Sequence, residues 1–399
     1  MKKRIIIISH AMELGGAEKS LLGLLSTIDT ERYDVDLFLL RHEGELMPFI
    51  PKNIHLLPEK PAYTVLARPM KDTLSEGHFM LTFARLVGKV FARIYEKKHK
   101  LTDSGVALDL SHKFTCPFMP DIEPAVEYDL AISFLCPHYF GLKKIKAKKR
   151  IAFIHTDYSK VQVDVESEEK IWGGYDHIAS ISPSVTDTFV GTFPSLASKI
   201  ILIENILPKA LIEQQKLAFD ASSEMPHKGI RLLSIGRFCT AKNFDNIPEI
   251  CRMLTDMGLD VYWYIIGYGP DEQIIRNKIA EFEVKDRVVI LGKKDNPYPY
   301  IDRCDLYVQP SRYEGKCVTV REAQMLLKPV VITDYATSAS QLENGVDGMI
   351  VPMKNSLCAI AIAELLCDPD KLKSLSLNCR NADYSNAEEI RKIYEIIDR

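Results

Sequence analysis

Short runs of apolar, largely β-branched residues recur along the chain, spaced so that a helix fits between most successive runs. The first series lies at residues 4–8, 35–40, 129–134, 150–155, 177–181 and 199–204, and the second at 231–235, 261–266, 287–291, 306–309, 330–333 and 348–351. Their hydrophobicity is continuous rather than alternating, which predicts parallel strands buried on both faces and covered by helices. Two such series predict an α/β fold with two Rossmann-like domains.

Length and polar stretches indicate where these domains begin and end. At 399 residues the chain favours two domains rather than one or three. We expect an N-terminal domain over residues 1–205 and a C-terminal domain over 206–385, with the polar stretch 216–229 as the strongest linker candidate. Residues 386–399 are amphipathic, and residues 56–120 are compatible with helices, with a loop, or with both.

The composition argues against several classes of protein. Charged residues make up 26% of the chain and hydrophobic ones 46%, as in ordinary soluble proteins, and the net charge of −3 gives no reason to expect a nucleic-acid partner. Nine cysteines without a C-x-x-C pair predict reduced thiols and a cytoplasmic protein. The four isoleucines near the start are too few for a signal peptide, and no apolar run approaches the roughly 18 residues of a membrane span.

Charged side chains follow two turns of the second series. Arg237 and Lys242 follow one glycine turn, and Glu314 and Glu322, separated by seven residues, follow the strand at 306–309. Open parallel sheets bind ligands at the carboxyl ends of their strands. Cations pair with phosphates and carboxylates accept hydrogen bonds from hydroxyls, so these four residues indicate a sugar joined to a nucleoside diphosphate.

Two other glycine turns invite nucleotide interpretations. Gly267 and Gly269 follow the strand at 261–266, but the third glycine of a dinucleotide fingerprint is missing, which favours a tight strand-to-helix turn near a nucleotide over a dehydrogenase. Gly15 and Gly16 follow the first strand without the lysine of a phosphate-binding Walker loop. They indicate either close approach to a ligand or an ordinary turn.

Histidine and aspartate motifs leave further alternatives open. His155 ends a predicted strand, where it serves either the structure or a ligand. Triplets of the D-x-D type at 34–36 and 368–370, and more loosely at 164–166, lie away from the phosphate motifs in the sequence, which argues against a metal site. Arg237, Lys242 and helix N-termini supply positive charge instead.

Two basic runs lie in the first half of the chain. Residues 85–100 alternate cations with apolar residues at helical spacing, and residues 143–150 carry six positive charges. Such runs are either solvated surfaces or contacts with anionic lipid.

Taken in order, these motifs resemble the donor-binding half of the retaining glycosyltransferases of family 4, which have the GT-B fold with two Rossmann-like domains facing a central cleft. The resemblance is strong over residues 234–352 and weaker at 15–18 and 155–157. It departs from the family at Lys316 and Cys317, where many relatives have Phe-Gly, and this departure leaves the transferred sugar open.

The resemblance also implies roles for individual residues. Arg237 and Lys242 are expected to bind the diphosphate, Glu322 the ribose and Glu314 the sugar, while His155 reaches the sugar from the acceptor side. The implied catalytic set is Glu314, His155, Arg237 and Lys242. The implied donor-binding set is Gly16, Arg237, Lys242, Gly267, Glu314, Gly315, Lys316, Cys317, Val318 and Glu322. Residues 386–399 are expected to cross back onto the first domain.

The resemblance implies a hexosyltransferase that needs no metal and no cofactor. It would transfer a sugar from a nucleoside-diphosphate sugar, with a UDP-sugar favoured, to a hydroxyl of a glycan or lipid-linked glycan during bacterial capsular or surface polysaccharide assembly. The place expected for such a protein is the cytoplasm or the inner face of the membrane. The alternatives are a nucleotide-sugar epimerase of GT-B fold and a catalytically weak sugar-nucleotide-binding assembly protein.

Overall fold

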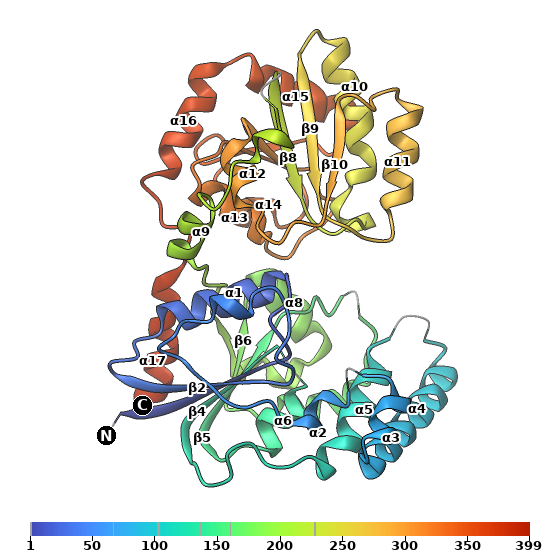
Figure 1. Cartoon of the computed structure of the whole chain (residues 1–399), viewed down its shortest axis with the longest axis vertical. Coiled ribbons are helices and arrows are strands. Elements are labelled where there is room, and N and C mark those ends of the chain that lie inside the picture. The colour runs from blue at the N-terminus through green and yellow to red at the C-terminus, as the bar shows by residue number, and fades with distance from the viewer. Residues whose placement is uncertain (1, 67, 102–103, 136, 160, 227–228) are drawn as a thin grey trace. The chain divides into compact units, whose positions relative to one another are not determined.

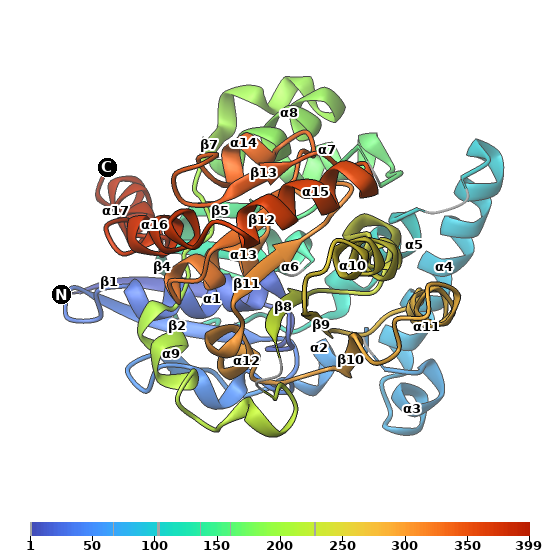
Figure 2. The ribbon, with the colours of Figure 1, turned by 90° about the horizontal axis from the view of Figure 1, so that it is seen from above.

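The computed structural model describes residues 2–66, 68–101, 104–135, 137–159, 161–226 and 229–399. The chain divides into two compact units, one of Met1–Leu207 with Asn386–Arg399 and the other of Pro208–Ser385 (Figures 1 and 2). We refer to them as unit 1 and unit 2. Each contains one parallel sheet, of seven and six strands respectively, which confirms the predicted fold class.

The sheet of unit 1 has the order β3-β2-β1-β4-β5-β6-β7, and all its neighbouring strands are parallel. Its strands are β1 (Lys3–Ser9), β2 (Tyr33–Leu39), β3 (His55–Leu56), β4 (Tyr128–Leu135), β5 (Ala147–Ile154), β6 (His177–Ser180) and β7 (Ile200–Leu202). All six predicted strands of the first series are present. In this sheet only the edge strand β3 has no counterpart among the predicted strands, because two residues do not make an apolar run.

Helices cover both faces of this sheet. Right-handed crossovers place α1 and α6 on opposite faces, because β1 leads to its neighbour on one side and β4 to its neighbour on the other (Figure 1). The helices of unit 1 are α1 (Gly16–Thr27), α2 (Pro61–Thr64), α3 (Met70–Ser75), α4 (Phe79–His99), α5 (Val106–Thr115), α6 (His138–Lys143), α7 (Val165–Trp172), α8 (Pro183–Thr192) and α17 (Ile390–Asp398). The described part of the stretch 56–120 is thus mainly helical.

The C-terminal helix α17 belongs to unit 1. Its Tyr394 ring stacks on Tyr33 of β2 at 4.9 Å between centroids, and Lys3 Nζ donates a hydrogen bond to the Ile397 carbonyl at 2.9 Å. Ile393, Ile396 and Ile397 are buried. The amphipathic end of the chain therefore covers the sheet of the unit in which the chain begins.

The sheet of unit 2 has the order β10-β9-β8-β11-β12-β13. Its strands are β8 (Ile230–Ile235), β9 (Val261–Ile266), β10 (Val288–Gly292), β11 (Leu306–Gln309), β12 (Val330–Thr333) and β13 (Met349–Val351), as the second series predicts. Its helices are α9 (Lys209–Gln215), α10 (Ile247–Asp256), α11 (Glu272–Glu281), α12 (Tyr298–Arg303), α13 (Val318–Met325), α14 (Ser338–Gln341), α15 (Asn355–Leu366) and α16 (Pro369–Cys379). Trp263 fills the core, and its Nε1 donates to Ser234 Oγ at 2.9 Å.

Short 3-10 helices complete the secondary structure. They are Met47–Phe49, Cys116–Phe118, Pro194–Lys199, Ala221–Ser223, Thr240–Lys242, Phe244–Asn246 and Ala387–Glu389. In the described part of the chain, no helix has the length and hydropathy that crossing a membrane requires.

The prediction that 216–229 forms a linker is wrong. The division between the units falls at Leu207 and Pro208, and the described residues of 216–229 pack within unit 2. Met225 is fully buried, and Glu224 accepts hydrogen bonds from Tyr300 Oη at 2.6 Å and Lys294 Nζ at 2.5 Å. The polar composition of this segment therefore reflects paired side chains rather than mobility. Residues 227 and 228 lie outside the described part.

Candidate functional site

The strand order of unit 2 reverses direction between β8 and β11. From β8 the next strands in sequence, β9 and β10, are added on one side of the sheet. From β11 the next strands, β12 and β13, are added on the other side. At such a switch point the loops that follow the two central strands diverge, which leaves room for a ligand at their carboxyl ends. The loop after β8 carries Arg237 and Lys242, and the loop after β11 carries Glu314. The fold thus brings charged groups together that are more than seventy residues apart in sequence.

Lys242 and Glu314 form an ion pair at this point. Lys242 Nζ lies 2.5 Å from Glu314 Oε1, and the two side chains are only 20% and 11% exposed. Ser311 Oγ donates to the same carboxylate oxygen at 2.6 Å. Burial disfavours the charged ammonium, but Cys317 and Glu314 outweigh burial and raise the pKa of Lys242 above its usual value. Lys242 is therefore protonated near physiological pH.

The loop that contains Glu314 is held by hydrogen bonds to residues 337–341. Thr337 Oγ1 donates to the Glu314 carbonyl at 2.7 Å, and Lys316 Nζ donates to the Ser340 carbonyl at 2.8 Å. The backbone N–H of Cys317 donates to Gln341 Oε1 at 2.8 Å. These contacts fix the Glu314–Cys317 segment, including Gly315, directly before α13 begins at Val318.

Cys317 is buried next to the ion pair. Its Sγ lies 3.9 Å from Lys242 Nζ and 3.3 Å from Thr319 Oγ1. Burial, followed by the charge of Glu314, raises the pKa of the Cys317 thiol. A neutral buried thiol packs beside the charged pair and is a poor nucleophile.

Glu322 has a different environment from Glu314. It lies one turn into α13 and is fully buried, and Tyr298 Oη donates to its Oε1 at 2.9 Å. Burial, and then the Glu322 carboxylate, raise the pKa of Tyr298 well above its ordinary value. Glu322 accepts a hydrogen bond from a protein hydroxyl in this structure, the kind of bond that a ribose hydroxyl donates.

Gly267 and Gly269 allow two turns to pack backbone against backbone. Their φ angles are +151° and +155°, and a Cβ on Gly267 would lie 1.9 Å from the Gly236 carbonyl oxygen. Phe238 N donates to the Tyr268 carbonyl at 2.8 Å, which ties the turn after β8 to the turn after β9. The structure therefore supplies a packing reason for both glycines.

Arg237 is the exposed cation of the site. Its side chain makes no hydrogen bond or ion pair with any other described residue. Arg312, in the loop after β11, is in contrast bound to Asp245 through two hydrogen bonds of 3.0 and 2.7 Å. Of the two arginines, only Arg237 is available to an added anion.

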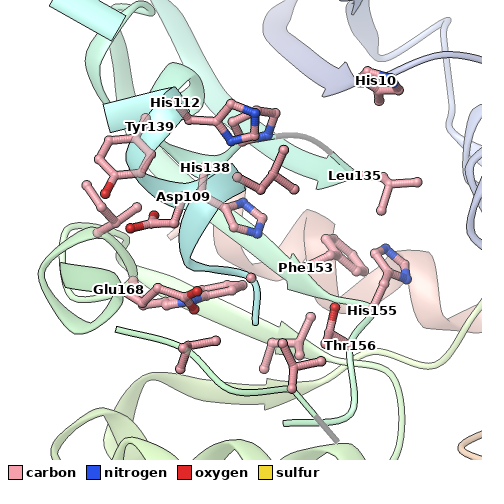
Figure 3. A pocket seen from close by; sticks show the side chains of 18 of the residues that line it. His10, Asp109, His112, Leu135, His138, Tyr139, Phe153, His155, Thr156 and Glu168 are labelled. Atoms are coloured by element: carbon pink, nitrogen blue, oxygen red, sulfur yellow. The ribbon is translucent and has the colours of Figure 1, made fainter. Parts of the chain in front are cut away.

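Unit 1 contains a pocket of about 610 Å³ at the carboxyl ends of β1, β4 and β5 (Figure 3). His10 and His155 follow β1 and β5, and Leu135 is the last residue of β4. Helices α5, α6 and α7 and the loops beside them contribute the remaining walls. Most of its lining is apolar, with aromatic side chains such as Phe153 and Trp172. The predicted residue His155 is thus one of four histidines on the pocket wall.

His155 packs against two aromatic rings. Its ring centroid lies 4.7 Å from that of Phe134 and 5.9 Å from that of Phe153. The Nε2 atom is buried without a hydrogen-bond partner among the described residues. Burial lowers the pKa of His155 to about 4, so the ring is neutral near physiological pH. A neutral imidazole with an unused nitrogen can donate or accept one hydrogen bond.

Two acidic side chains share this pocket with the histidines (Figure 3). Burial raises the pKa of Glu168 to about 7, although Tyr158 Oη donates to its Oε2 at 2.8 Å. Burial also raises the pKa of Asp109, which accepts from Ser167 Oγ at 3.1 Å. Neither residue stands in a sequence motif, and only the fold brings them to the pocket.

Gly16 is the first residue of α1 in unit 1 and is exposed. It begins the helix directly after β1 and its loop, at the same edge of the sheet as the pocket residue His10. Gly16 and His155 therefore belong to unit 1, whereas the other predicted site residues belong to unit 2.

The D-x-D triplets have structural partners. Asp36 accepts from Tyr128 Oη at 2.6 Å and lies 2.7 Å from His55 Nδ1. Asp368 and Asp164 accept from backbone N–H groups at the starts of α16 and α7. Within the described ranges, no three His, Cys, Asp or Glu side chains are grouped so as to hold a metal ion.

Comparisons with known proteins identify glycosyltransferases among the similar sequences and structures. Residues 215–382 match the family model described as glycosyl transferases group 1. The amylovoran biosynthesis glycosyltransferase AmsK of Erwinia amylovora is 29% identical over 144 residues, which are 34% of this chain and 35% of that protein. An N-acetylgalactosamine-N,N'-diacetylbacillosaminyl-diphospho-undecaprenol 4-alpha-N-acetylgalactosaminyltransferase of Campylobacter jejuni is 26% identical over 169 residues, 42% of this chain and 45% of that protein. The chain thus spans less than half the length of these relatives.

Solved structures extend the likeness to the whole chain. The Anabaena protein Alr3699/HepE in complex with UDP and glucose superposes with a TM-score of 0.67 at 13% identity, covering 98% of this chain and 99% of that chain. TarM of S. aureus, in a complex that contains UDP, superposes with a TM-score of 0.67 at 13% identity over 100% of both chains. At these identities the likeness shows the fold, which is that of GT-B glycosyltransferases.

Proposed function

We propose that the protein is a retaining glycosyltransferase of family 4 that transfers a sugar from a UDP-sugar to a hydroxyl of a glycan or lipid-linked glycan. The observation that supports this most is the largely buried Lys242–Glu314 pair at the switch point of unit 2, within the segment that matches the glycosyl transferases group 1 model. The UDP in the Anabaena and S. aureus complexes supports the donor class. The diphospho-undecaprenol in the name of the Campylobacter relative supports a lipid-linked acceptor.

Donor binding begins with an exchange of partners at the ion pair. The Lys242 ammonium leaves the Glu314 carboxylate and pairs with a phosphate oxygen of the donor. The exposed Arg237 binds a second phosphate oxygen. Glu314 then accepts hydrogen bonds from hydroxyls of the sugar, while Glu322 accepts them from the ribose. A single charge-assisted contact of this kind is worth roughly 1.5–3 kcal/mol. The glycine turn and the N-terminus of the following helix add backbone N–H groups towards the phosphates.

Sugar transfer follows from the charges of the same residues. The bond between the anomeric carbon and the diphosphate oxygen breaks, and the electron pair stays with the diphosphate. Lys242 and Arg237 stabilise the charge that develops there. The acceptor oxygen adds to the anomeric carbon on the same face, and its proton passes to the departing phosphate oxygen. These cations take the place of a metal ion in the proposal, and no cofactor takes part.

The pocket of unit 1 serves the acceptor in this proposal. Its apolar lining suits the faces of sugar rings or a lipid chain, and the unused Nε2 of His155 can bind one hydroxyl. His155 then positions the acceptor and does not act as the general base, since the leaving diphosphate takes the proton. We also propose a cytoplasmic location, where nucleotide sugars are available.

The test is incubation of the purified protein with a panel of UDP-sugars, with and without lipid-linked glycan acceptors, followed by mass spectrometry and NMR of the products. The proposal expects free UDP and an α-linked product only when an acceptor is present. An altered UDP-sugar without any acceptor would establish the epimerase instead. Tight binding of UDP-sugars with neither product would establish a binding protein, and Glu314→Gln serves as the inactive control for the transferase.

A further inference from the structure

Helix α4 presents a row of large apolar side chains to solvent. At 21 residues it is the longest helix in the described part of the chain. Seven of its large apolar side chains are between 45% and 64% exposed: Phe79, Met80, Phe83, Leu86, Val90, Phe91 and Ile94. Five of these follow one another at intervals of three or four residues and so line one side of the helix. Isolated exposed apolar residues are common in proteins, but a contiguous row of this size marks an interaction surface.

The opposite side of α4 is firmly packed. Leu81, Ala84, Gly88 and Ala92 are buried, and α4 and α5 lie side by side (Figures 1 and 2). A Cβ on Gly88 would lie 2.8 Å from the Leu110 carbonyl oxygen, so the two backbones approach closely. The orientation of α4 is therefore set by close packing, and its apolar row faces outwards as a consequence.

The charges of α4 are almost all positive. The helix contains five lysines and arginines and a single acidic residue, Glu96. The Glu96 carboxylate accepts a hydrogen bond from Ser104 Oγ at 2.6 Å. Arg85 is occupied within unit 1, where its Nη1 donates to the Val65 carbonyl at 2.7 Å. Arg93, Lys97 and Lys98 are exposed and flank the C-terminal end of the apolar row.

The second basic run is not equivalent to α4. Lys146 and Lys149 donate to the carbonyls of Pro124 and Ile396, both at 2.8 Å. Lys148 pairs with Asp129 at 2.7 Å, and Arg150 Nη1 donates to the Ala147 carbonyl at 2.8 Å. Most cations of residues 143–150 are thus used within the unit, and no apolar row accompanies them.

We propose that α4 is an interfacial helix that binds the surface of an anionic lipid bilayer. Its apolar row enters the boundary between headgroups and acyl chains, and Arg93, Lys97 and Lys98 contact the lipid phosphates. Charge selects this occupant, because the exposed cations at one end of the row, Arg93, Lys97 and Lys98, complement the phosphates of an anionic lipid surface. The inference does not depend on the proposed transferase activity.

One geometric consequence concerns the pocket of unit 1. Helix α5, on which α4 packs, contributes Leu108, Asp109 and His112 to the pocket wall. Binding of α4 to a bilayer therefore brings the pocket of the same unit close to the lipid surface.

The test is flotation of the full-length protein with vesicles of phosphatidylglycerol and phosphatidylcholine in equal parts, or of phosphatidylcholine alone. Binding is expected to the anionic vesicles. The variant Phe83→Gln/Leu86→Gln/Val90→Gln should lower the partition coefficient roughly tenfold or more, because three apolar side chains no longer enter the bilayer. The matched control Leu357→Gln/Ile360→Gln/Leu377→Gln changes three side chains of unit 2 that are 43–47% exposed, and it should bind as the wild type does.

A charge series completes the experiment. Arg93→Gln/Lys97→Gln/Lys98→Gln should weaken binding to anionic vesicles several-fold and reduce its dependence on salt, whereas Lys143→Gln should have little effect. Circular dichroism of each variant checks folding. Wild-type binding by the α4 triple variant, no binding by the wild type, or a dimer in light scattering that this variant dissolves would each overturn the proposal.

Discussion

The candidate sites of the two units differ in how their residues are held and charged. In unit 2, Lys242 and Glu314 hold opposite charges in an ion pair of 2.5 Å. In unit 1, His155 is neutral, Glu168 titrates near neutrality, and the walls are mostly apolar. A site with paired charges suits a charged diphosphate, whereas an apolar site with one unused ring nitrogen suits a largely neutral acceptor. The comparison predicts that substitutions in unit 2 act on the donor and substitutions in unit 1 on the acceptor.

The largest expected effect is that of Glu314→Gln on turnover. If Glu314 binds the sugar as its bond to the diphosphate breaks, kcat should fall about a hundredfold or more, at about 1.4 kcal/mol for each factor of ten. The effect should lie in kcat rather than in KM for the donor, because the contact strengthens in the transition state. Steady-state kinetics at saturating acceptor measure it. Full turnover in this variant would remove Glu314 from the catalytic set.

The next effect concerns the phosphates. Lys242→Ala and Arg237→Ala should each weaken UDP binding by roughly ten- to a hundredfold, the equivalent of 1.5–3 kcal/mol for a lost charge-assisted contact. Lys278→Ala removes a cation that is paired with Glu281 on the surface of α11, and it should leave UDP affinity unchanged. Isothermal calorimetry gives all three values. Unchanged affinity in both site variants would contradict the assignment.

The pH dependence of stability tests the environment of Glu168 in the pocket of unit 1. The pKa of Glu168 is raised from 4.5 to about 7 in the folded protein, mainly by burial. Folding therefore favours the protonated form, and the stability this contributes is present below pH 4.5 and is lost as the pH rises to about 7. The upper limit is about 1.4 kcal/mol per unit of pKa difference. Glu168→Gln should consequently gain stability over the wild type with rising pH in this window.

Urea denaturation across this pH window tests the Glu168 prediction. The histidines of the pocket act in the opposite direction, because burial lowers the pKa of His155 to about 4 and its stabilising contribution is lost as the pH falls from 6.5. Comparing Glu168→Gln with the wild type at each pH cancels the histidine contribution. A difference between them that does not vary with pH would show that Glu168 ionises normally.

Much of the fold and of the unit 2 site could be predicted because their signals are local. Continuous apolar runs predicted every described strand except the two-residue β3. Glu314 and Ser311, which donates a hydrogen bond to it, lie only three residues apart in the sequence. The pocket of unit 1 was not predictable in the same way. Asp109, His138 and Glu168 come from separate helices and carry no motif, so only folding brings them together. The linker prediction for 216–229 was wrong because composition shows that side chains are polar but not that they are paired in the folded protein.

The smallest expected effects concern Tyr298 and metal ions. Tyr298→Phe removes the hydroxyl that donates to the buried Glu322, so the free energy of unfolding should fall by about 1–3 kcal/mol while UDP still binds. Loss of UDP binding with unchanged stability would reverse the roles assigned to these residues. Chemical denaturation with and without UDP distinguishes the two outcomes.

Treatment with EDTA should leave the initial rate unchanged, because Lys242 and Arg237 carry the charge of the leaving group in the proposal. The control adds magnesium or manganese back after dialysis. A rate that falls with EDTA and returns with either ion would contradict the proposed metal independence.

The central claim is that the Lys242–Glu314 pair exchanges partners when the donor binds, and UDP affinity in two glutamate variants tests it most directly. Glu314→Gln releases Lys242 from its carboxylate, so the account predicts that UDP binds as tightly as to the wild type or more tightly. Glu322→Gln should bind UDP more weakly, because the ribose loses its acceptor. Equal losses of UDP affinity in both variants, measured by calorimetry, would contradict the account.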